Sequence, residues 1–359
     1  MEKLKAVLLV GGLGTRLRPL TNDRPKSTVP VLNRPVLEHT LAYLKHFGIR
    51  DIVITLNYLP EVIEEYFGDG EKFGVKLTYF MEEEPRGTAG AVKNAESYLD
   101  GPFFVLNGDI FTDMNLNDMY AFHRRNKAQA TIALTQVDNP CSFGVVETSD
   151  KLKVRRFIEK PPPGTETSNW INAGTYILER DVLDVIPPGC NYMFERGLFP
   201  QLLQTGRPVF AYQYNGYWLD MGNPANYHVI CQDYLNGKIQ NLIFKTNSKS
   251  IVYNKRSVSI HKSVKIQPPV VIGDGFSMAE GGQIIGPCSI GKDCRIDNGT
   301  FIEDTIIWDG VTVGSNARIK RCIISSGTII PDNMNLENSI VTPGQTLPLP
   351  PAECIRKQD

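Results

Sequence analysis

Residues 284–302 read IIGPCSIGKDCRIDNGTFI, and an isoleucine returns there at every sixth position. Counting outward in steps of six gives a column of large apolar residues: Ile260, Ile266, Ile272, Met278, Ile284, Ile290, Ile296, Ile302 and Trp308. A second column of mostly small or medium residues lies two positions earlier, as at Cys288, Cys294 and Ile306. A period of six fits neither an α-helix nor an alternating strand. It predicts a left-handed parallel β-helix built from hexapeptides, with the main column pointing inward.

The hexapeptide period extends from about Ile251 to Val341, with the phase slipping by one residue at Val313 and again at Ile324. This length predicts roughly four to five triangular coils of three hexapeptides each. Because a solenoid leaves an open end and flat faces, we expect residues 251–341 to assemble the chain into a homo-oligomer, a dimer or a tetramer. We also expect deletion of these residues to change the oligomeric mass more than the chemistry. Residues 342–359 are proline-rich and are expected to form an extended tail.

The first 240 residues follow a different rhythm, in which apolar runs alternate with helical patterns. Ala6–Val10 is a continuous apolar run, typical of a parallel strand that is buried on both faces. Further strands are predicted at 51–56, 75–80 and 103–106, and helices at 35–47, 60–67 and 88–99. This alternation predicts a three-layer, Rossmann-like α/β domain over residues 1–240, with ligands at the carboxyl ends of its strands.

The composition narrows the function classes. The chain has 359 residues, a net charge of −1 and 42% hydrophobic residues, so no general attraction to nucleic acid or to anionic membranes is expected. Its seven cysteines are scattered, without a CxxC pair or a His/Cys cluster, which argues against a structural zinc site. No signal peptide or membrane-spanning segment is recognisable, so we expect a cytoplasmic protein with reduced thiols.

A glycine-rich turn, Gly11-Gly12-Leu13-Gly14-Thr15-Arg16, directly follows the first strand. Glycines allow backbone N–H groups to approach phosphate oxygens, and arginine supplies a matching charged fork. The turn is not a Walker A loop, since no Gly-Lys-Ser/Thr follows, nor a dinucleotide fingerprint, since Leu17 replaces the third glycine. Alone, such a turn is equally compatible with a structural role. Lys26, ten residues after Arg16, favours the phosphate site.

Six motifs occur in an order that resembles the sugar-1-phosphate nucleotidyltransferases. They are Gly11–Thr21 followed by Pro25-Lys26, Glu82–Gly90, Leu106–Asp109, Phe157–Pro161, Asn172–Gly174 and Trp218–Gly222. With the hexapeptide region, the resemblance covers nearly the whole chain, and the glutamate-rich segment is most similar to the GDP-mannose pyrophosphorylase branch. It implies transfer of a nucleotidyl group from an NTP to a sugar 1-phosphate, with GTP and mannose 1-phosphate as the expected pair. Ser27 and Arg86 depart from the usual proline and leucine.

The resemblance implies five catalytic residues: Arg16, Lys26, Asp109, Lys160 and Asp220. Arg16 and Lys26 are expected to neutralise the triphosphate, and Lys160 to hold the phosphate of the sugar. Asp109 and Asp220 are expected to bind Mg²⁺, which prefers oxygen ligands. From the residues alone, Asp109 is also compatible with a helix N-cap near Asn115. Lys26 and Lys160 are also compatible with ordinary surface charges.

The same resemblance assigns the binding residues. Those expected to contact the nucleotide are Gly11, Gly12, Gly14, Thr15, Arg16, Glu82, Gly87, Thr88, Ala89, Asn107 and Gly108. Those expected to contact the sugar phosphate are Glu159, Lys160, Asn172 and Gly174. Thr88 is equally compatible with a helix N-cap.

Alternatives from other classes remain. A sugar phosphate is nucleophilic at neutral pH, so the absence of a recognisable Ser-His-Asp or Cys-His constellation agrees with nucleotidyl transfer. A glucose-1-phosphate thymidylyl-, adenylyl- or uridylyltransferase would share the scaffold. A non-catalytic regulatory subunit would be free to lose Lys26, Asp109, Lys160 or Asp220. An acyltransferase would need a base such as His261, for which an exposed corner is the simpler interpretation.

Overall fold

The computed structural model describes residues 4–82, 84–239, 246–253 and 255–345. The chain divides into two compact units, each assembled from two separate stretches. We call residues 1–13 with 40–218 the sheet unit, and residues 14–39 with 219–359 the β-helix unit. Of the tail expected over 342–359, residues 346–359 lie outside the described residues.

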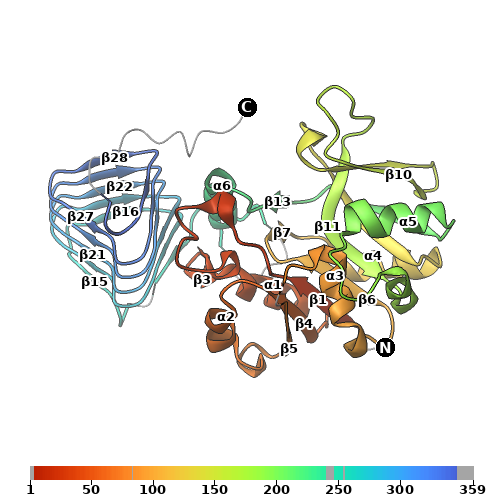
Figure 1. The fold of residues 1–359 in the computed structure, drawn as a ribbon. Coiled ribbons are helices and arrows are strands. Elements are labelled where there is room, and N and C mark those ends of the chain that lie inside the picture. The colour runs from red at the N-terminus through yellow and green to blue at the C-terminus, as the bar shows by residue number, and fades with distance from the viewer. Residues whose placement is uncertain (1–3, 83, 240–245, 254, 346–359) are drawn as a thin grey trace. The chain divides into compact units, whose positions relative to one another are not determined.

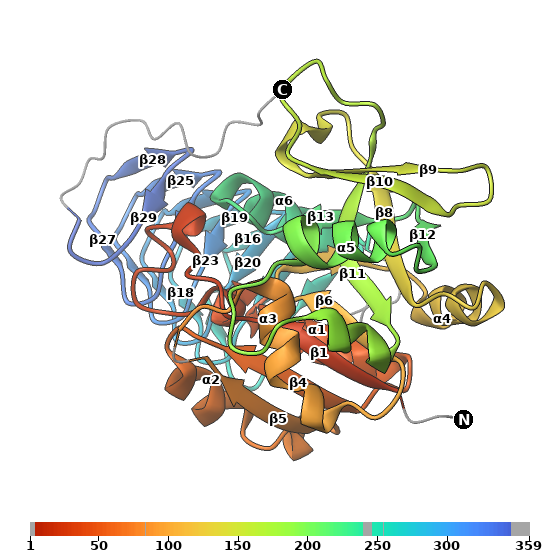
Figure 2. The same ribbon diagram turned by 45° about the vertical axis from the view of Figure 1, so that its right-hand side comes forward.

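The sheet unit is built around one nine-stranded mixed sheet (Figure 2). Its main path runs β10-β9-β11-β6-β1-β4-β5, and β8 pairs with both β11 and β12. The bounds are β1 Lys5–Leu9, β4 Asp51–Leu56, β5 Lys76–Met81, β6 Phe103–Asn107, β8 Ala130–Gln136, β9 Gly144–Thr148, β10 Val154–Glu159, β11 Trp170–Leu178 and β12 Val209–Gln213. Strands β6, β1, β4 and β5 are parallel, whereas β11 runs antiparallel to β6. The parallel half is the part that the strand and helix alternation predicted.

The described residues contain six α-helices. Their bounds are α1 Val36–His46, α2 Pro60–Phe67, α3 Gly87–Asn94, α4 Leu116–Arg125, α5 Phe199–Gln204 and α6 Pro224–Leu235. The predicted bounds of α2 and β4 are confirmed. The helix predicted over 88–99 is shorter, because Ala95 donates its N–H to the carbonyl of Val92 at 3.1 Å and a 3-10 turn follows over Glu96–Tyr98.

The central strands bury side chains on both faces. Val7, Val53 and Val105 belong to one apolar cluster with Val92 of α3 and Phe199 of α5. The alternate residues point to the opposite face and are also fully or nearly fully buried, namely Leu8, Ile54 and Phe104. A strand that is buried on both faces has no polar alternation, which explains the continuous apolar run at the start of the chain.

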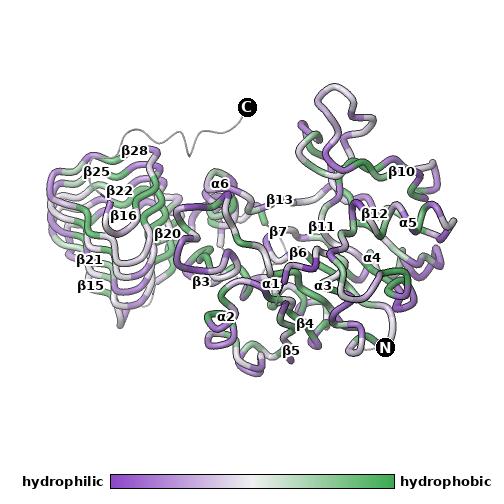
Figure 3. Tube along the Cα trace, in the orientation of Figure 1, coloured by the Kyte–Doolittle hydropathy of each residue, from purple (hydrophilic) through white to green (hydrophobic). Residues whose placement is uncertain are grey.

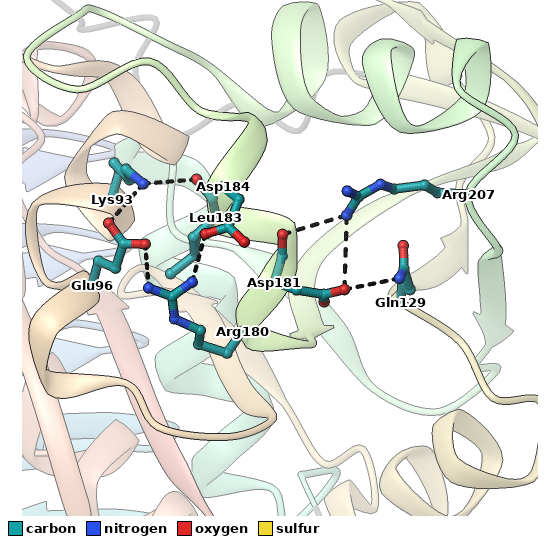
Figure 4. Close-up of polar contacts among 8 residues, drawn as sticks. All are labelled: Lys93, Glu96, Gln129, Arg180, Asp181, Leu183, Asp184 and Arg207. Carbon is teal, nitrogen blue, oxygen red and sulfur yellow. Dashed lines mark hydrogen bonds and ion pairs between the residues drawn. The ribbon is translucent and has the colours of Figure 1, made fainter.

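Ion pairs connect α3 to the 3-10 helix over Arg180–Val185 (Figure 4). Lys93 Nζ lies 2.6 Å from Glu96 Oε2 and donates to the carbonyl of Leu183 at 3.0 Å. Arg180 bridges Glu96 at 2.7 Å and Asp184 at 2.5 Å. Arg180 and Asp184 are 41% and 57% exposed, and exposed pairs of this kind contribute only about 0–1 kcal/mol. The Lys93–Glu96 pair, with side chains 16% and 22% exposed, is better shielded from water.

Three parallel sheets form the faces of the β-helix (Figure 1). One is β14-β17-β20-β23-β26-β29, the second β15-β18-β21-β24-β27, and the third β16-β19-β22-β25-β28. The bounds are β14 Ile251–Val252, β15 Ser259–Ile260, β16 Lys265–Gln267, β17 Val270–Ile272, β18 Ser277–Met278, β19 Gln283–Ile285, β20 Cys288–Ile290, β21 Arg295–Ile296, β22 Phe301–Glu303, β23 Ile306–Ile307, β24 Thr312–Val313, β25 Arg318–Lys320, β26 Ile323–Ile324, β27 Ile329–Ile330, β28 Asn335–Glu337 and β29 Ile340–Val341. Ile284, Ile302 and Ile319 stack on one another as predicted. Apolar residues recur from coil to coil in Figure 3.

The prediction that Trp308 ends the inward column is wrong. Strand β20 pairs with β23 so that Ile290 stacks on Ile307, and it is Ile307 that belongs to the interior cluster. The phase therefore slips between Ile302 and Ile307, and Ile306 leaves the second column with it. The left-handed corner residue lies here at Asp304, with φ 50°, two positions after Ile302. In the six-residue step that follows Ile290, it lies three positions on, at Asp293. Trp308 consequently leaves the interior of the solenoid.

Candidate active site

The glycine turn and the Asp109 motif meet at the carboxyl edge of the parallel strands. Leu9, at the end of β1, is in register with Thr55 of β4 and Asn107 of β6. Gly108 donates its N–H to the carbonyl of Leu9 at 3.0 Å. The predicted site residues at the ends of these strands are therefore close in space: Gly11, Gly12, Asn107 and Gly108, expected to contact the nucleotide, and Asp109, expected to bind the metal. Glu82 follows the neighbouring β5 and donates its N–H to the carbonyl of Leu56 at 2.9 Å.

Asp109 does not cap the helix that follows it. The side chain of Asn115 accepts the N–H groups of Asn117 and Asp118, at 3.0 and 3.3 Å, and is the N-cap of α4. The N-cap interpretation of Asp109 is therefore wrong. Asp109 lies two residues beyond β6, half-buried at the carboxyl edge of the sheet.

Asn172 and Gly174 lie on β11, beside the end of β6. Asn172 Oδ1 accepts the N–H of Gly174 at 3.0 Å, and its Nδ2 donates to the hydroxyl of Tyr176 at 2.8 Å. Gly174 has φ 66°, and a Cβ atom there would lie 2.5 Å from Asn107 Nδ2. Only glycine combines this backbone with this close approach. The strand expected to bind the sugar therefore contacts a residue expected to bind the nucleotide.

The start of α3 is fastened to the segment around Tyr192. The N–H groups of Ala89 and Gly90 both donate to the carbonyl of Tyr192 at 2.9 Å. Thr88 is the second residue of α3, and its hydroxyl accepts the N–H of Phe194 at 3.0 Å. The N-cap interpretation of Thr88 is therefore wrong, because its hydroxyl bonds a distant segment and Arg86 occupies the N-cap position. Gly87 opens the helix with φ 68°.

Glu159 and Lys160 end β10 next to an acidic residue that the sequence did not reveal. Lys160 is exposed, adopts φ 48° and donates its N–H to the carbonyl of Phe143 at 3.0 Å. Glu195, in the π-helix Phe194–Leu198, has its Oε2 3.4 Å from the hydroxyl of Thr88. Burial raises the pKa of Glu195, the charge of Glu159 raises it further, and Thr88 and Lys160 oppose the shift. Glu195 thus lies within electrostatic reach of both predicted sugar-phosphate residues.

A signal for Glu195 exists in the sequence. It is an acidic residue within Phe194-Glu195-Arg196-Gly197-Leu198-Phe199, a segment whose three apolar residues are fully buried. A carboxylate in such a segment is costly unless it has a partner or a function. Sequence periodicity does not show which partner it meets.

Glu195→Gln is expected to raise the KM for the sugar phosphate by about tenfold, the equivalent of one charge-assisted hydrogen bond. The reason is that Glu195 lies within electrostatic reach of Lys160, which is expected to hold that phosphate. The melting temperature should not fall, because the variant removes a charge that burial disfavours. Steady-state kinetics and thermal unfolding measure the two effects. Glu147→Gln is the matched control, because Glu147 also accepts a hydrogen bond from a threonine, Thr167, at 2.6 Å. An unchanged KM in Glu195→Gln would remove this role.

In the β-helix unit, three predicted catalytic residues come together. Asp220, on the short strand β13 (Trp218–Asp220), has Oδ1 3.8 Å from Lys26 Nζ and Oδ2 3.8 Å from Arg16 Nη2. The side chains of Asp220 and Lys26 are only 19% and 13% exposed, whereas that of Arg16 is 72% exposed. Gly14 and Thr15 immediately precede Arg16 in the same loop, and Gly14 has φ 61°.

The backbone after Asp220 keeps this group close. A Cβ atom on Gly222 would lie 2.7 Å from Asp220 Oδ2 and 3.1 Å from Arg16 Nη1, so a larger residue would require these side chains to shift. Asn226 Nδ2 donates to the carbonyl of Asp220 at 2.7 Å, which ties β13 to α6. Two cations flank one carboxylate at distances longer than a direct hydrogen bond. Such a group suits an anionic ligand that arrives with a metal ion.

Other chemistries have less support among the described residues. His261 is exposed, with Nδ1 2.8 Å from the hydroxyl of Ser263, as expected of a surface corner. No described cluster of three or more His, Cys, Asp or Glu side chains has the arrangement of a metal site. None of the helices in the described part of the chain has the length and apolar character needed to cross a bilayer.

A family model described as nucleotidyl transferase matches residues 5–237, and one described as the LbH domain of the EIF2B epsilon subunit matches residues 249–347. The chain is 34% identical to a mannose-1-phosphate guanylyltransferase of Mycobacterium tuberculosis, over 89% of this chain and 84% of the relative. It is also 34% identical to a UTP--glucose-1-phosphate uridylyltransferase of Synechocystis sp., over 88% and 86%. A crystal structure of HddC from Yersinia pseudotuberculosis superposes with a TM-score of 0.57 and 28% identity, over 64% of this chain and 99% of that chain.

The first of these models covers well over half of the chain, and its match spans both the glycine turn and Asp220. The second coincides with the three-faced solenoid and supports its assignment as a left-handed β-helix. The chain therefore belongs to the nucleotidyl transferase family.

Proposed function

We propose that this protein transfers the guanylyl group of GTP to mannose 1-phosphate, giving GDP-mannose and pyrophosphate. A phosphate oxygen of the sugar phosphate attacks the α-phosphorus, and the bond from that phosphorus to the bridging oxygen of pyrophosphate breaks. The name of the Mycobacterium tuberculosis relative supports this pair. The equally similar Synechocystis relative makes UTP with glucose 1-phosphate the alternative.

The observation that carries the proposal is the placement of Asp220 between Lys26 and Arg16. Attack of one phosphate on another requires two mutually repelling anions to be held in line, with the growing charge spread over fixed cations. Lys26 is half-buried, so its side chain has few accessible conformations. This suits a contact with the triphosphate near the reacting phosphorus. Arg16 is exposed, and we assign it to the outer phosphates.

The acidic residues fit a divalent cation. Asp220 and Asp109 offer carboxylate oxygens, the donor class that Mg²⁺ prefers, and the cations beside Asp220 lie 3.8 Å from its oxygens. We propose that these two aspartates hold Mg²⁺. When bound, the ion would polarise phosphate oxygens and help to align the reactants.

The remaining residues bind and orient. We propose that Lys160 holds the phosphate of the sugar, because its left-handed backbone is pinned by Phe143 and leaves the ammonium exposed. Glu159, Asn172 and Gly174 are assigned to the sugar hydroxyls. The glycine turn, Glu82, the Gly87–Ala89 segment and Asn107-Gly108 are assigned to the nucleotide. No general base is required, because the sugar phosphate is already ionised at neutral pH.

Mg²⁺-dependent pyrophosphate release, measured over GTP, dTTP, ATP and UTP with mannose, glucose and heptose 1-phosphates, tests the proposal. We expect one dominant signal with GTP and mannose 1-phosphate, and a loss of about 100-fold or more in Asp109→Asn. A dominant signal with another pair would correct the substrates and keep the reaction. A folded protein without signal in any combination would favour the regulatory-subunit alternative.

Three further assignments belong to this proposal. Residues 1–240 are assigned to nucleotidyl transfer, and residues 251–341 to assembly of a homo-oligomer. The protein is proposed to act in the cytoplasm. Sedimentation of the purified chain and cell fractionation test the last two.

A further inference from the structure

The loop that carries Lys26 ends in a tight hairpin. Lys26 lies in a 3-10 turn over Lys26–Thr28, followed by β2 (Pro30–Val31) and β3 (Arg34–Pro35). The two residues between these strands, Leu32 and Asn33, have φ of 48° and 64°. Left-handed conformations at both positions define the tight turn that matches the twist of a hairpin. Lys26 is thus placed by a short, stiff segment, so whatever holds the hairpin also holds Lys26.

The tip of the hairpin is bonded to the β-helix. Asn33 Nδ2 donates to the carbonyl of Ile290 at 2.6 Å, and the hydroxyl of Ser289 donates to Asn33 Oδ1 at 3.0 Å. Ser289 is 1% exposed and Ile290 is fully buried, and both belong to β20 of the solenoid. Both polar atoms of the asparagine amide therefore bond one strand of one coil.

The base of the hairpin is bonded through Trp308, the residue that leaves the interior of the solenoid. The guanidinium of Arg24 stacks over the Trp308 ring at 4.7 Å. Trp308 Nε1 donates to the hydroxyl of Tyr227 at 2.9 Å, and that hydroxyl donates to the carbonyl of Pro30 at 2.5 Å. Trp308 is 2% exposed and Tyr227 is fully buried. A buried hydrogen-bond relay thus runs from β-helix to α6 to β2.

Helix α6 connects the same coils to Asp220. Its Asn226 bonds the carbonyl of Asp220, as described above. Two residues further along the helix, His228 Nε2 lies 3.0 Å from the carbonyl of Asp304. Gln232, one turn beyond His228, donates to the carboxylate of Asp304. Asp304 is the left-handed residue at the shortened corner, four positions before Trp308. The coil that contains Asp304 and Trp308 therefore contacts both the hairpin that follows Lys26 and the helix that follows Asp220.

We propose that the β-helix is the rigid support that positions Lys26 and Asp220, with Asn33, Tyr227 and Trp308 as positioning residues. The inference rests on the proposed function, because it assumes that Lys26 binds the triphosphate. Its physical basis is that a misplacement of about 1 Å in a site of this kind can lower the rate by about 100-fold. The β-helix thus contributes to chemistry within each chain. This differs from the sequence-based expectation that its deletion chiefly changes the oligomeric mass.

Three variants of the full chain test the inference. Asn33→Gly keeps the left-handed backbone and removes both bonds to β20. Trp308→Leu removes the stack on Arg24 and the hydrogen bond to Tyr227. Trp308→Phe keeps a ring beneath Arg24. Phe301→Leu is the matched control, because Phe301 also lies under an arginine, Arg318 at 5.2 Å, but on the sheet that contains β22 rather than β20 and β23.

We expect Asn33→Gly and Trp308→Leu to lower kcat by about tenfold or more and to raise the KM for the nucleotide. Trp308→Phe should recover most of the turnover, and Phe301→Leu should match the parent. Hydrogen–deuterium exchange of residues 22–34 should quicken in the first two variants only. This second readout does not depend on activity, so it separates a failed inference from a failed function.

Unchanged exchange over residues 22–34 in both folded Asn33→Gly and Trp308→Leu would overturn the proposal, whatever their activity. Faster exchange with unchanged kcat in an active enzyme would overturn it as well, since the contacts would then be structural only. If the parent has no transferase activity, the proposed function fails. The exchange data then still decide whether the β-helix holds the loop that carries Lys26.

Discussion

Asp220→Asn is expected to lower the rate of pyrophosphate release by about 100-fold or more while leaving the protein folded. The substitution keeps the size of the side chain and removes the charge that lies 3.8 Å from both Lys26 and Arg16. Amide oxygens bind Mg²⁺ less strongly than carboxylates do, so the dependence on metal should also change. Steady-state assays at increasing Mg²⁺ measure both effects.

The control for this variant is Asp297→Asn. Asp297 lies in the same unit and pairs with Arg295 at 3.5 Å, but it belongs to the surface of the solenoid. Its kinetics should equal those of the parent. Lys26→Met should reproduce the loss of turnover without altering the Mg²⁺ dependence. If Asp220→Asn kept full activity at low Mg²⁺, the assignment of Asp220 to the metal would have to be abandoned.

Gly174→Ala is expected to destabilise the protein by about 2–5 kcal/mol and to impair catalysis. Its φ of 66° places an alanine in a strained conformation, which costs about 1–2 kcal/mol. The added methyl would also lie 2.5 Å from Asn107 Nδ2 and clash with Ile110, and overpacking of this kind costs about 1–3 kcal/mol. Relief of the clash moves Asn107, so the KM for the nucleotide should rise. Chemical denaturation and kinetics measure the two effects.

Gly164→Ala separates strain from crowding. Gly164 has φ 81°, but nothing lies within 4 Å of the position that its Cβ would take. This variant should therefore lose only the strain of about 1–2 kcal/mol and keep its activity. Equal losses of stability in the two variants would show that the contact with Asn107 is not tight.

Local patterns in the sequence were sufficient for much of the fold. The helix at Pro60–Phe67 and the strand at Asp51–Leu56 have the predicted bounds, because proline, glycine and apolar periodicity act within a few residues. The stacking of Ile284, Ile302 and Ile319 followed from the period of six. Strands β8 and β12 were not predicted, since their pairing with each other and of β8 with β11 joins segments that are distant in sequence.

Some residues of the candidate site could be named from the sequence, and others only from the structure. The motif residues Arg16, Lys26 and Asp220 were named from the sequence, and the structure groups them. Glu195 was missed because its significance depends on burial near Glu159 and Lys160, which no local pattern encodes. The capping interpretations of Asp109 and Thr88 failed for two different reasons. Asn115 caps the helix that follows Asp109, and the hydroxyl of Thr88 bonds the distant Phe194.

The sequence by itself determined the family, the α/β and β-helix classes and the identity of the polar residues at the strand ends, because these depend on residue type and short periodicity. Only the tertiary structure decided that residues 14–39 join residues 219–359 in one compact unit. It also decided that Trp308 turns away from the solenoid interior toward Tyr227 and Arg24. Both depend on hydrogen bonds between segments about 80 to 260 residues apart, whose free energy exists only once the chain is folded.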